Sequence, residues 1–149
     1  MKESILHYIW QQKLFNAHSL RSTDGEAIEV IDVGKANTDA GPDFFNAKIR
    51  IGTTIWAGNI EIHVQSGDWN KHNHQSDKAY DSTILHVVKT ADTVIYRSNG
   101  EKIPQLELEY PQYIEENYEK LISAQKWIPC AGRLEKVVHV FIQDWITTL

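Results

Sequence analysis

Two adjacent segments with alternating apolar and polar residues constrain the fold of this chain most strongly. The first reads FFNAKIRI and the second reads TIWAGNIEIHVQ. A side-chain period of two is typical of a strand with one covered face. The connecting GTT is too short for a crossover, so the two segments are expected to form an antiparallel hairpin. The predicted core positions are Phe45, Ala47, Ile49, Ile51, Trp56, Ile60, Ile62 and Val64.

The remaining sequence predicts helices at both ends of a sheet. Residues 3–15 carry an apolar stripe at helical spacing, and residues 26–33 predict a strand. STILHVVK is apolar on both faces and predicts a central strand, whereas TVIYR, SNG and KIPQLELE predict a hairpin whose last strand, with Pro104, lies at an edge. A helix is expected after Pro111. The class is therefore α+β, a mostly antiparallel or mixed sheet of about six strands flanked by an N-terminal helix and C-terminal helices.

Chain length and the last sixteen residues predict the domain organisation. A length of 149 residues fits one domain with a core, which we place at residues 1–130. LEKVVHVFIQDWITTL is strongly amphipathic, so residues 131–149 are expected to form a helix that begins a longer C-terminal region. Its apolar face needs either that region or a second copy of the chain as a partner.

Composition and sequence patterns restrict the cellular location and the partners expected for this protein. A single cysteine excludes an internal disulfide, no apolar run is long enough to cross a membrane and no signal peptide is evident. We therefore expect a cytoplasmic protein with no membrane partner. The net charge of −5 disfavours a surface that grips nucleic acid all over, but it leaves room for a local basic strip.

The polar face of the hairpin assembles a candidate catalytic site. Glu61 and His63 share one face of the second strand, and strict alternation puts Lys48 of the first strand on the same face. Asp43 precedes the first strand, directly after Gly41-Pro42. Alternation assigns Asp43 to the apolar face, so it joins the site only if the chain bends or bulges at residues 41–43.

An Asp followed about twenty residues later by Glu-x-Lys on a neighbouring strand is the layout of the PD-(D/E)XK nuclease superfamily. This chain resembles that layout at Asp43 and at Glu61-Ile62-His63, with His63 in place of the lysine and a polar loop with at best a short helix where the superfamily usually has a helix. The resemblance implies a restriction-endonuclease-like fold and a nucleic-acid substrate. Asp43 and Glu61 would hold Mg²⁺ or Mn²⁺, and His63 or Lys48 would position the attacking water. Lys48, Arg50 and Lys71 would contact backbone phosphates.

Two histidines in the following loop offer an alternative metal site. His72 and His74 could chelate zinc, with His63 and His86 as further ligands, although no paired cysteines support a structural zinc site. His86 lies in an apolar strand and is more simply a hydrogen-bonded core histidine. Trp69 is either a lid or base-stacking platform or a residue that pins its loop to the core.

Four stretches carry a resemblance to a known family. They read LHYIWQQKLFN, TDGEAIEVIDVGKANTDAGPDFFNAKIRIGTTIWAGNIEIHV, DWNKHNHQSDKAYDSTILHVV and NGEKIPQLEL. The chain is similar to the N-terminal part of the uncharacterised bacterial family called domain of unknown function 2851. The resemblance implies a mixed α and β unit and a longer native protein, and it implies no activity.

Two functional hypotheses follow from the residues. The first is a metal-dependent phosphodiesterase or nuclease-like domain that uses Asp43, Glu61, His63 and Lys48. The second is a non-catalytic β-rich module that binds a partner, which predicts no metal binding and an exposed apolar patch around Val138, Phe141 and Trp145.

Overall fold

The computed structural model describes residues 1–125 of the chain. The chain forms two compact units, Met1–Tyr110 and Pro111–Leu149. The predicted boundary at residue 130 and the predicted helix at 131–149 lie outside the described residues, and so does the apolar patch predicted around Val138, Phe141 and Trp145.

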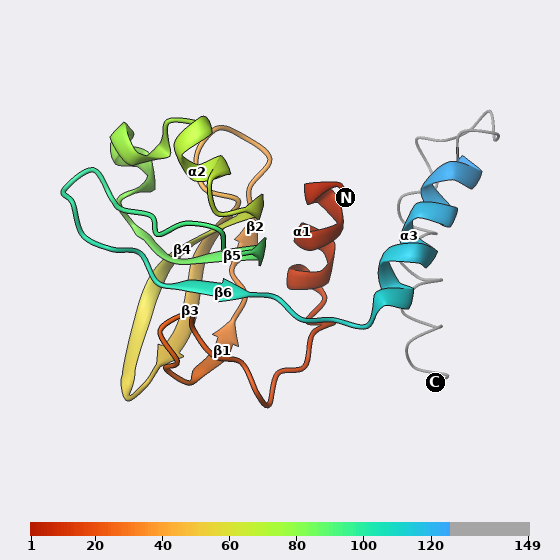
Figure 1. The fold of residues 1–149 in the computed structure, drawn as a ribbon, viewed down its shortest axis with the longest axis horizontal. Helices are drawn as coiled ribbons and strands as arrows, with labels where there is room; N and C mark the ends of the chain where they lie inside the picture. Colours follow the sequence, from red (N-terminus) through yellow and green to blue (C-terminus); the bar gives the residue numbers. More distant parts are fainter. Residues whose placement is uncertain (126–149) are drawn as a thin grey trace. The chain divides into compact units, whose positions relative to one another are not determined.

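A six-stranded mixed sheet forms the core of the first unit (Figure 1). Its strands run in the order β1-β3-β4-β5-β6, and β2 also pairs with β3. The pairs β1–β3 and β3–β4 are antiparallel, whereas β4–β5 and β5–β6 are parallel. These pairings confirm the α+β class, the hairpin and the central position of β5. The strands are β1 (Ile28–Asp32), β2 (Lys35–Ala36), β3 (Phe44–Ile51), β4 (Thr54–Gln65), β5 (Thr83–Thr90) and β6 (Gln105–Glu107).

The helices follow the apolar stripes of the sequence. Helix α1 (Glu3–Gln11) packs against β4 and buries Ile5, Leu6, Ile9 and Trp10. The segment between β4 and β5 contains α2 (Asp68–Lys71) and two 3₁₀ turns, η1 (His74–Ser76) and η2 (Lys78–Tyr80). In the second unit, α3 (Gln112–Gln125) begins directly after Pro111. Within residues 1–125, no helix combines the length and the apolar character needed to cross a membrane.

The predicted hairpin at residues 93–109 is correct at its turn and wrong in its pairing. Arg97 N–H donates to the Glu101 carbonyl at 2.8 Å, and Gly100 has a φ of 85°, as an Asn-Gly turn requires. Beyond the turn, only an isolated bridge joins Tyr96 to Lys102. Glu101 and Ile103 face the first arm of the hairpin, whereas Pro104 faces β5, where its carbonyl accepts from His86 N–H at 2.9 Å, and β6 continues by pairing in parallel with β5. As predicted, β6 lies at the edge of the sheet.

A bulge in β3 corrects the alternation read from the sequence. Asn46 has a φ of 56°, and the β3–β4 register shifts between Phe44 and Ala47. The extra residue places Phe44, which is buried, on the core face with Ala47. Phe45, predicted for the core, is only half-buried. The bulge therefore reverses the expected faces of all residues that precede it in β3.

Trp56 and Trp69 differ in burial, and Trp56 departs from its predicted position in the core. Trp56, predicted for the core, is 48% exposed because the tip of the β3–β4 hairpin extends away from α1 and α2 (Figure 1). Trp69 is completely buried, and its Nε1–H donates to the Tyr96 carbonyl at 3.1 Å. Trp69 thus pins its segment to the core, one of the two roles predicted for it.

We expect Trp69→Ala to lower the free energy of unfolding of the full chain by about 3–5 kcal/mol, because it leaves a large cavity and an unpaired carbonyl. The matched control Trp56→Ala should cost about 1 kcal/mol or less, since Trp56 is half in solvent. Urea unfolding followed by circular dichroism measures both. Equal losses for the two variants would contradict this packing.

Candidate functional site

Asp43 and Glu61 form a locked pair where β3 begins. Asp43 N–H donates to Glu61 Oε2 at 3.1 Å, and Asp43 Oδ2 accepts from Ile62 N–H at 2.9 Å. The bulge after Phe44 makes this possible, because it brings Asp43 to the same face as Glu61. The required distortion therefore lies at residues 45–46 rather than at 41–43, where the sequence analysis placed it.

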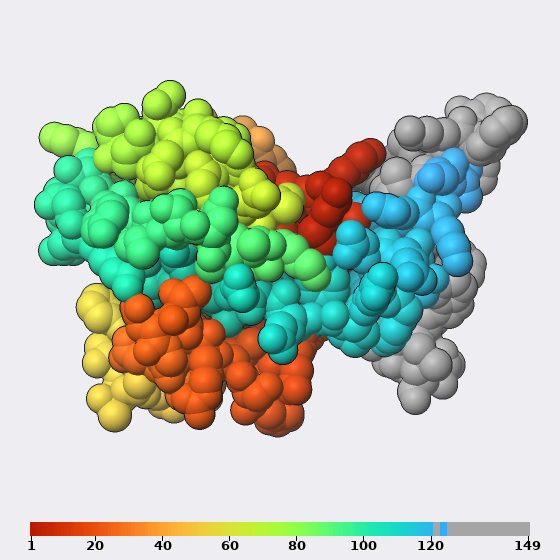
Figure 2. All heavy atoms as spheres, in the orientation of Figure 1, coloured from red at the N-terminus to blue at the C-terminus, as the bar shows by residue number. Residues whose placement is uncertain are grey.

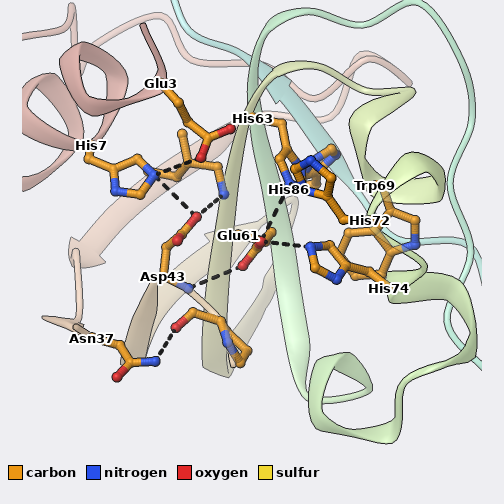
Figure 3. Close-up of polar contacts among 12 residues, drawn as sticks. Glu3, His7, Asn37, Asp43, Glu61, His63, Trp69, His72, His74 and His86 are labelled. Carbon is orange, nitrogen blue, oxygen red and sulfur yellow. Dashed lines mark hydrogen bonds and ion pairs between the residues drawn. The ribbon is translucent and has the colours of Figure 1, made fainter. Parts of the chain in front are cut away.

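One asparagine, Asn37, holds the turn before β3 and thereby positions Asp43. Asn37 Nδ2 donates to the carbonyls of Asp39, Ala40 and Pro42 at 3.0–3.2 Å, and Asn37 N–H donates to the Asp43 carbonyl at 2.8 Å (Figure 3). These bonds satisfy the carbonyls of a loop that has no regular ladder. Asn37 thus fixes the entry of the chain into β3.

Helix α1 adds a histidine and a third carboxylate beside Asp43 (Figure 3). His7 Nε2 lies 3.3 Å from Asp43 Oδ2 and 3.8 Å from Glu3 Oε1. Burial lowers the pKa of His7, but the hydrogen bond to Asp43 and the nearby carboxylates outweigh it, so the net pKa is raised. Burial and the charge of Asp43 raise the pKa of Glu3. The carboxylates around His7 therefore favour its protonated form beside Asp43.

On its other side, Glu61 faces a cluster of histidines. Glu61 Oε1 lies 3.2 Å from His74 Nε2 and 3.5 Å from His63 Nε2. His63 Nε2 also lies 3.2 Å from His72 Nδ1, and His63 Nδ1 lies 2.7 Å from His86 Nε2. The histidines come from β4, the C-terminal end of α2, η1 and β5. His86 is a hydrogen-bonded core histidine, as predicted.

The segment that follows β4 covers this cluster. The His74 ring stacks on Tyr80 with centroids 3.7 Å apart, and Trp69 packs edge-on against both His74 and His86. Figure 2 shows the yellow-green α2–η2 segment as a continuous layer at the surface of the unit. Glu61 and His63 are consequently buried. The polar face of β4 is covered, whereas the hairpin pattern predicted a sheet with a single covered face.

Burial controls the protonation of the centre. It raises the pKa of Glu61 to about 7, with the charge of Asp43 in the same direction and the hydrogen bond with His74 against it. Burial and then the neighbouring His86 lower the pKa of His63 to about 2. Burial also lowers the pKa of His86 to about 4, against its hydrogen bond with Gln105. His63 and His86 are therefore neutral at pH 7.

The structure brings together three of the four predicted catalytic residues, Asp43, Glu61 and His63. Lys48 is on the same face but pairs with Ala57, four residues before Glu61, which is about 13 Å along the strand. The prediction that Lys48 lies at the site is therefore wrong, because Lys48 lies too far along the strand from Glu61. Among the other predicted phosphate contacts, Arg50 forms an ion pair with Glu29, and Lys71 Nζ lies 2.8 Å from Asp68 Oδ1.

Sequence reasoning missed His7, Glu3, Asn37 and Gln105. One signal for His7 was available, because Glu3 and His7 are four residues apart on a predicted helix and so lie on one side of it. Nothing local in the sequence marks Asn37 or Gln105, since their partners depend on how the loops pack. These four residues lie around the predicted site. Glu3 and His7 lie beside Asp43, Asn37 hydrogen-bonds to the Asp43 carbonyl, and Gln105 hydrogen-bonds to His86.

Three histidines form the metal-ligand group of the described residues. His63, His72 and His74 each offer a ring nitrogen, and the three nitrogens all lie within 4.8 Å of one another. Within residues 1–125, no group of three or more that includes Asp43 meets the same spacing. Imidazole nitrogens suit zinc and related transition metals, whereas Mg²⁺ prefers oxygen ligands.

Fold and site together define an α+β protein with a buried carboxylate–histidine centre. The chain belongs to the family described as protein of unknown function (DUF2851), whose model matches residues 3–149. No match was found among curated proteins or among solved structures. The resemblance to this family is thereby confirmed, and the activity has to be argued from the site.

The pKa shifts predict that acid destabilises the metal-free protein. Around pH 5.5, the unfolded chain protonates His63 and His86, which stay neutral in the fold, whereas folded Glu61 keeps a proton that the unfolded chain releases. Counting these three groups, the unfolded state thus binds about one proton more, while the raised pKa values of His7 and Glu3 act in the opposite direction. The free energy of unfolding should fall by about 1.4 kcal/mol for each pH unit of acidification.

Glu61→Gln provides the matched variant because glutamine does not titrate. It removes the opposing proton, so the slope should steepen to about 2.7 kcal/mol per pH unit. Urea unfolding at several pH values in the presence of a chelator measures both proteins. An unchanged or shallower slope in Glu61→Gln would show that Glu61 does not hold a proton in the fold.

Proposed function

We propose that this chain is a metal-dependent hydrolase of phosphodiesters, a nuclease-like domain centred on Glu61. The observation that carries the proposal is the position of Glu61, buried between Asp43 on one side and His63 and His74 on the other. Its side-chain neighbours on the second side are histidines, a residue type that exchanges protons and binds metals near neutral pH. A carboxylate placed in this way serves chemistry better than stability, because burying it costs free energy.

The order of elements supports a nuclease-like reading of the acidic pair. Helix α1, the antiparallel strands β1, β3 and β4, and a crossover through α2 to the parallel strand β5 follow in sequence. Asp43 stands at the start of one strand and Glu61 within the next, as the nuclease layout has them. The short helix α2 lies in the polar loop for which the sequence predicted at most a short helix.

Each residue of the centre has a role in such a hydrolysis. A divalent ion at Glu61 would polarise the scissile phosphate and lower the pKa of an attacking water. Asp43 orients Glu61 through its backbone N–H, and His7 balances the charge of Asp43. Lys71 is exposed directly beside His72 and could meet a phosphate of a nucleic-acid substrate if it leaves Asp68.

The proposal predicts metal-dependent cleavage by the full chain. Labelled single- and double-stranded oligonucleotides and a chromogenic phosphodiester are incubated with Mg²⁺, Mn²⁺, Zn²⁺ or Co²⁺ in turn. We expect cleavage with at least one ion and a loss of about 100-fold or more in Glu61→Gln, since the ion would lose a charged ligand. Asp43→Asn should lose less, because its backbone N–H still holds Glu61.

Glu29→Gln is the control, an exposed acid of the same sheet that lies outside the centre. It should retain the parent activity. Absence of cleavage with every ion would overturn the hydrolase and favour the non-catalytic binding module. Equal cleavage by the parent and Glu61→Gln would place the activity elsewhere.

A further inference from the structure

We propose that His63, His72 and His74, together with Glu61 Oε1, form a binding site for one divalent transition metal ion of the zinc class. The inference deepens the proposed function by naming the ion of the same centre, but metal binding can be measured without any activity. Mg²⁺ and Mn²⁺, expected from the acidic pair, are replaced by an ion that prefers imidazole.

The spacing of the donor atoms supports this assignment. Two ligands about 2.0–2.1 Å from a tetrahedral zinc ion lie about 3.3 Å from each other. The measured separations are 3.2 Å for His63 Nε2 to His72 Nδ1, 3.5 Å for His63 Nε2 to Glu61 Oε1 and 3.2 Å for His74 Nε2 to Glu61 Oε1. These values match three of the six edges of a tetrahedron around one ion, and the ligand nitrogens of the three histidines lie within 4.8 Å of one another.

A chain of hydrogen bonds aims the lone pair of His63 into the site. Gln105 Nε2 donates to the Thr93 carbonyl at 2.8 Å, so its Oε1 must face His86 Nδ1, 3.2 Å away. His86 then carries its proton on Nδ1 and accepts at Nε2 from His63 Nδ1–H at 2.7 Å. The unprotonated nitrogen of His63 is therefore Nε2, the atom among the proposed ligands. Such outer hydrogen bonds are the usual support of metal-binding histidines.

The resulting polarity favours a proton or a cation between His63 and Glu61. With His63 protonated on Nδ1, its Nε2 lone pair lies 3.5 Å from Glu61 Oε1, which is also an acceptor when the carboxylate is ionised. Two buried acceptors that face each other are unfavourable unless a proton or a cation lies between them. A metal ion bound to both removes this conflict while leaving the carboxylate ionised.

His72 and His74, the two proposed ligands from the segment that follows β4, are positioned before any metal ion binds. Asn73, between His72 and His74, has a φ of 60°, which turns the chain so that the two histidines approach His63 together. Stacking on Tyr80 fixes His74, whereas His72 is exposed. Solvent therefore reaches the centre at His72.

Calorimetry on the tag-free, chelator-stripped full chain tests the site with Zn²⁺, Co²⁺ and Mg²⁺. We expect one Zn²⁺ per chain, a visible absorption band typical of four-coordinate Co²⁺, and far weaker binding of Mg²⁺. His72→Ala should weaken Zn²⁺ binding by at least 10-fold. Because His72 is exposed, this variant should keep its fold, which circular dichroism checks.

Two further variants sharpen the test. His18→Ala removes an exposed histidine outside the cluster and should leave Zn²⁺ affinity unchanged. Gln105→Leu removes the support of His86 and should weaken Zn²⁺ binding by about 10-fold or more while the four proposed ligands remain. A folded Gln105→Leu protein with parent affinity would overturn the hydrogen-bond argument.

The results of the binding and cleavage experiments distinguish the proposed metal site from the proposed hydrolase activity. Zn²⁺ binding that His72→Ala weakens, without cleavage of any phosphodiester, supports the site and overturns the proposed function. Cleavage with Mg²⁺ in a protein that binds no Zn²⁺ or Co²⁺ overturns the site and keeps the hydrolase. Binding that His72→Ala retains in full also overturns the site.

Discussion

The burial of the Glu61 carboxylate is the constraint on which the rest of the centre depends. A carboxylate removed from water must be neutralised, paired or bound to a cation. In this chain the surrounding groups are a backbone N–H from Asp43 and the imidazoles of His63 and His74. The bulge in β3, the turn held by Asn37 and the covering segment of Trp69 all serve to place these groups around one side chain.

Neutral groups make this burial tolerable without a metal. The pKa of Glu61 is raised to about 7, and the pKa values of His63 and His86 are lowered to about 2 and 4. All three shifts favour the neutral forms of the buried groups, while His7 lies beside Asp43 at the side of α1. The centre avoids the cost of an isolated buried ion by shifting protons.

Sequence patterns predicted the strands and the shared face of Glu61 and His63, because a side-chain period of two is a local property of a strand. They could not place Asp43, since its face depends on one bulged residue, Asn46, with a positive φ. They also failed for Lys48, because a shared face does not fix the position along a strand, and the register set by the hairpin turn pairs Lys48 with Ala57, four residues before Glu61. The roles of Trp56 and Trp69 depend on which end of β4 is covered, a tertiary feature that periodicity does not record.

The two sides of Glu61 differ in their access to solvent, and this difference determines the side from which a cation can reach the carboxylate. On the side of α1, Glu61 Oε2 is occupied by the Asp43 N–H, and Asp43 Oδ2 by the Ile62 N–H. On the other side, Glu61 Oε1 faces only imidazoles, and one member of that cluster, His72, is exposed. A cation arriving from solvent therefore meets Oε1 and the histidines first. Its charge would favour ionised Glu61, so that proton release and metal binding become one event.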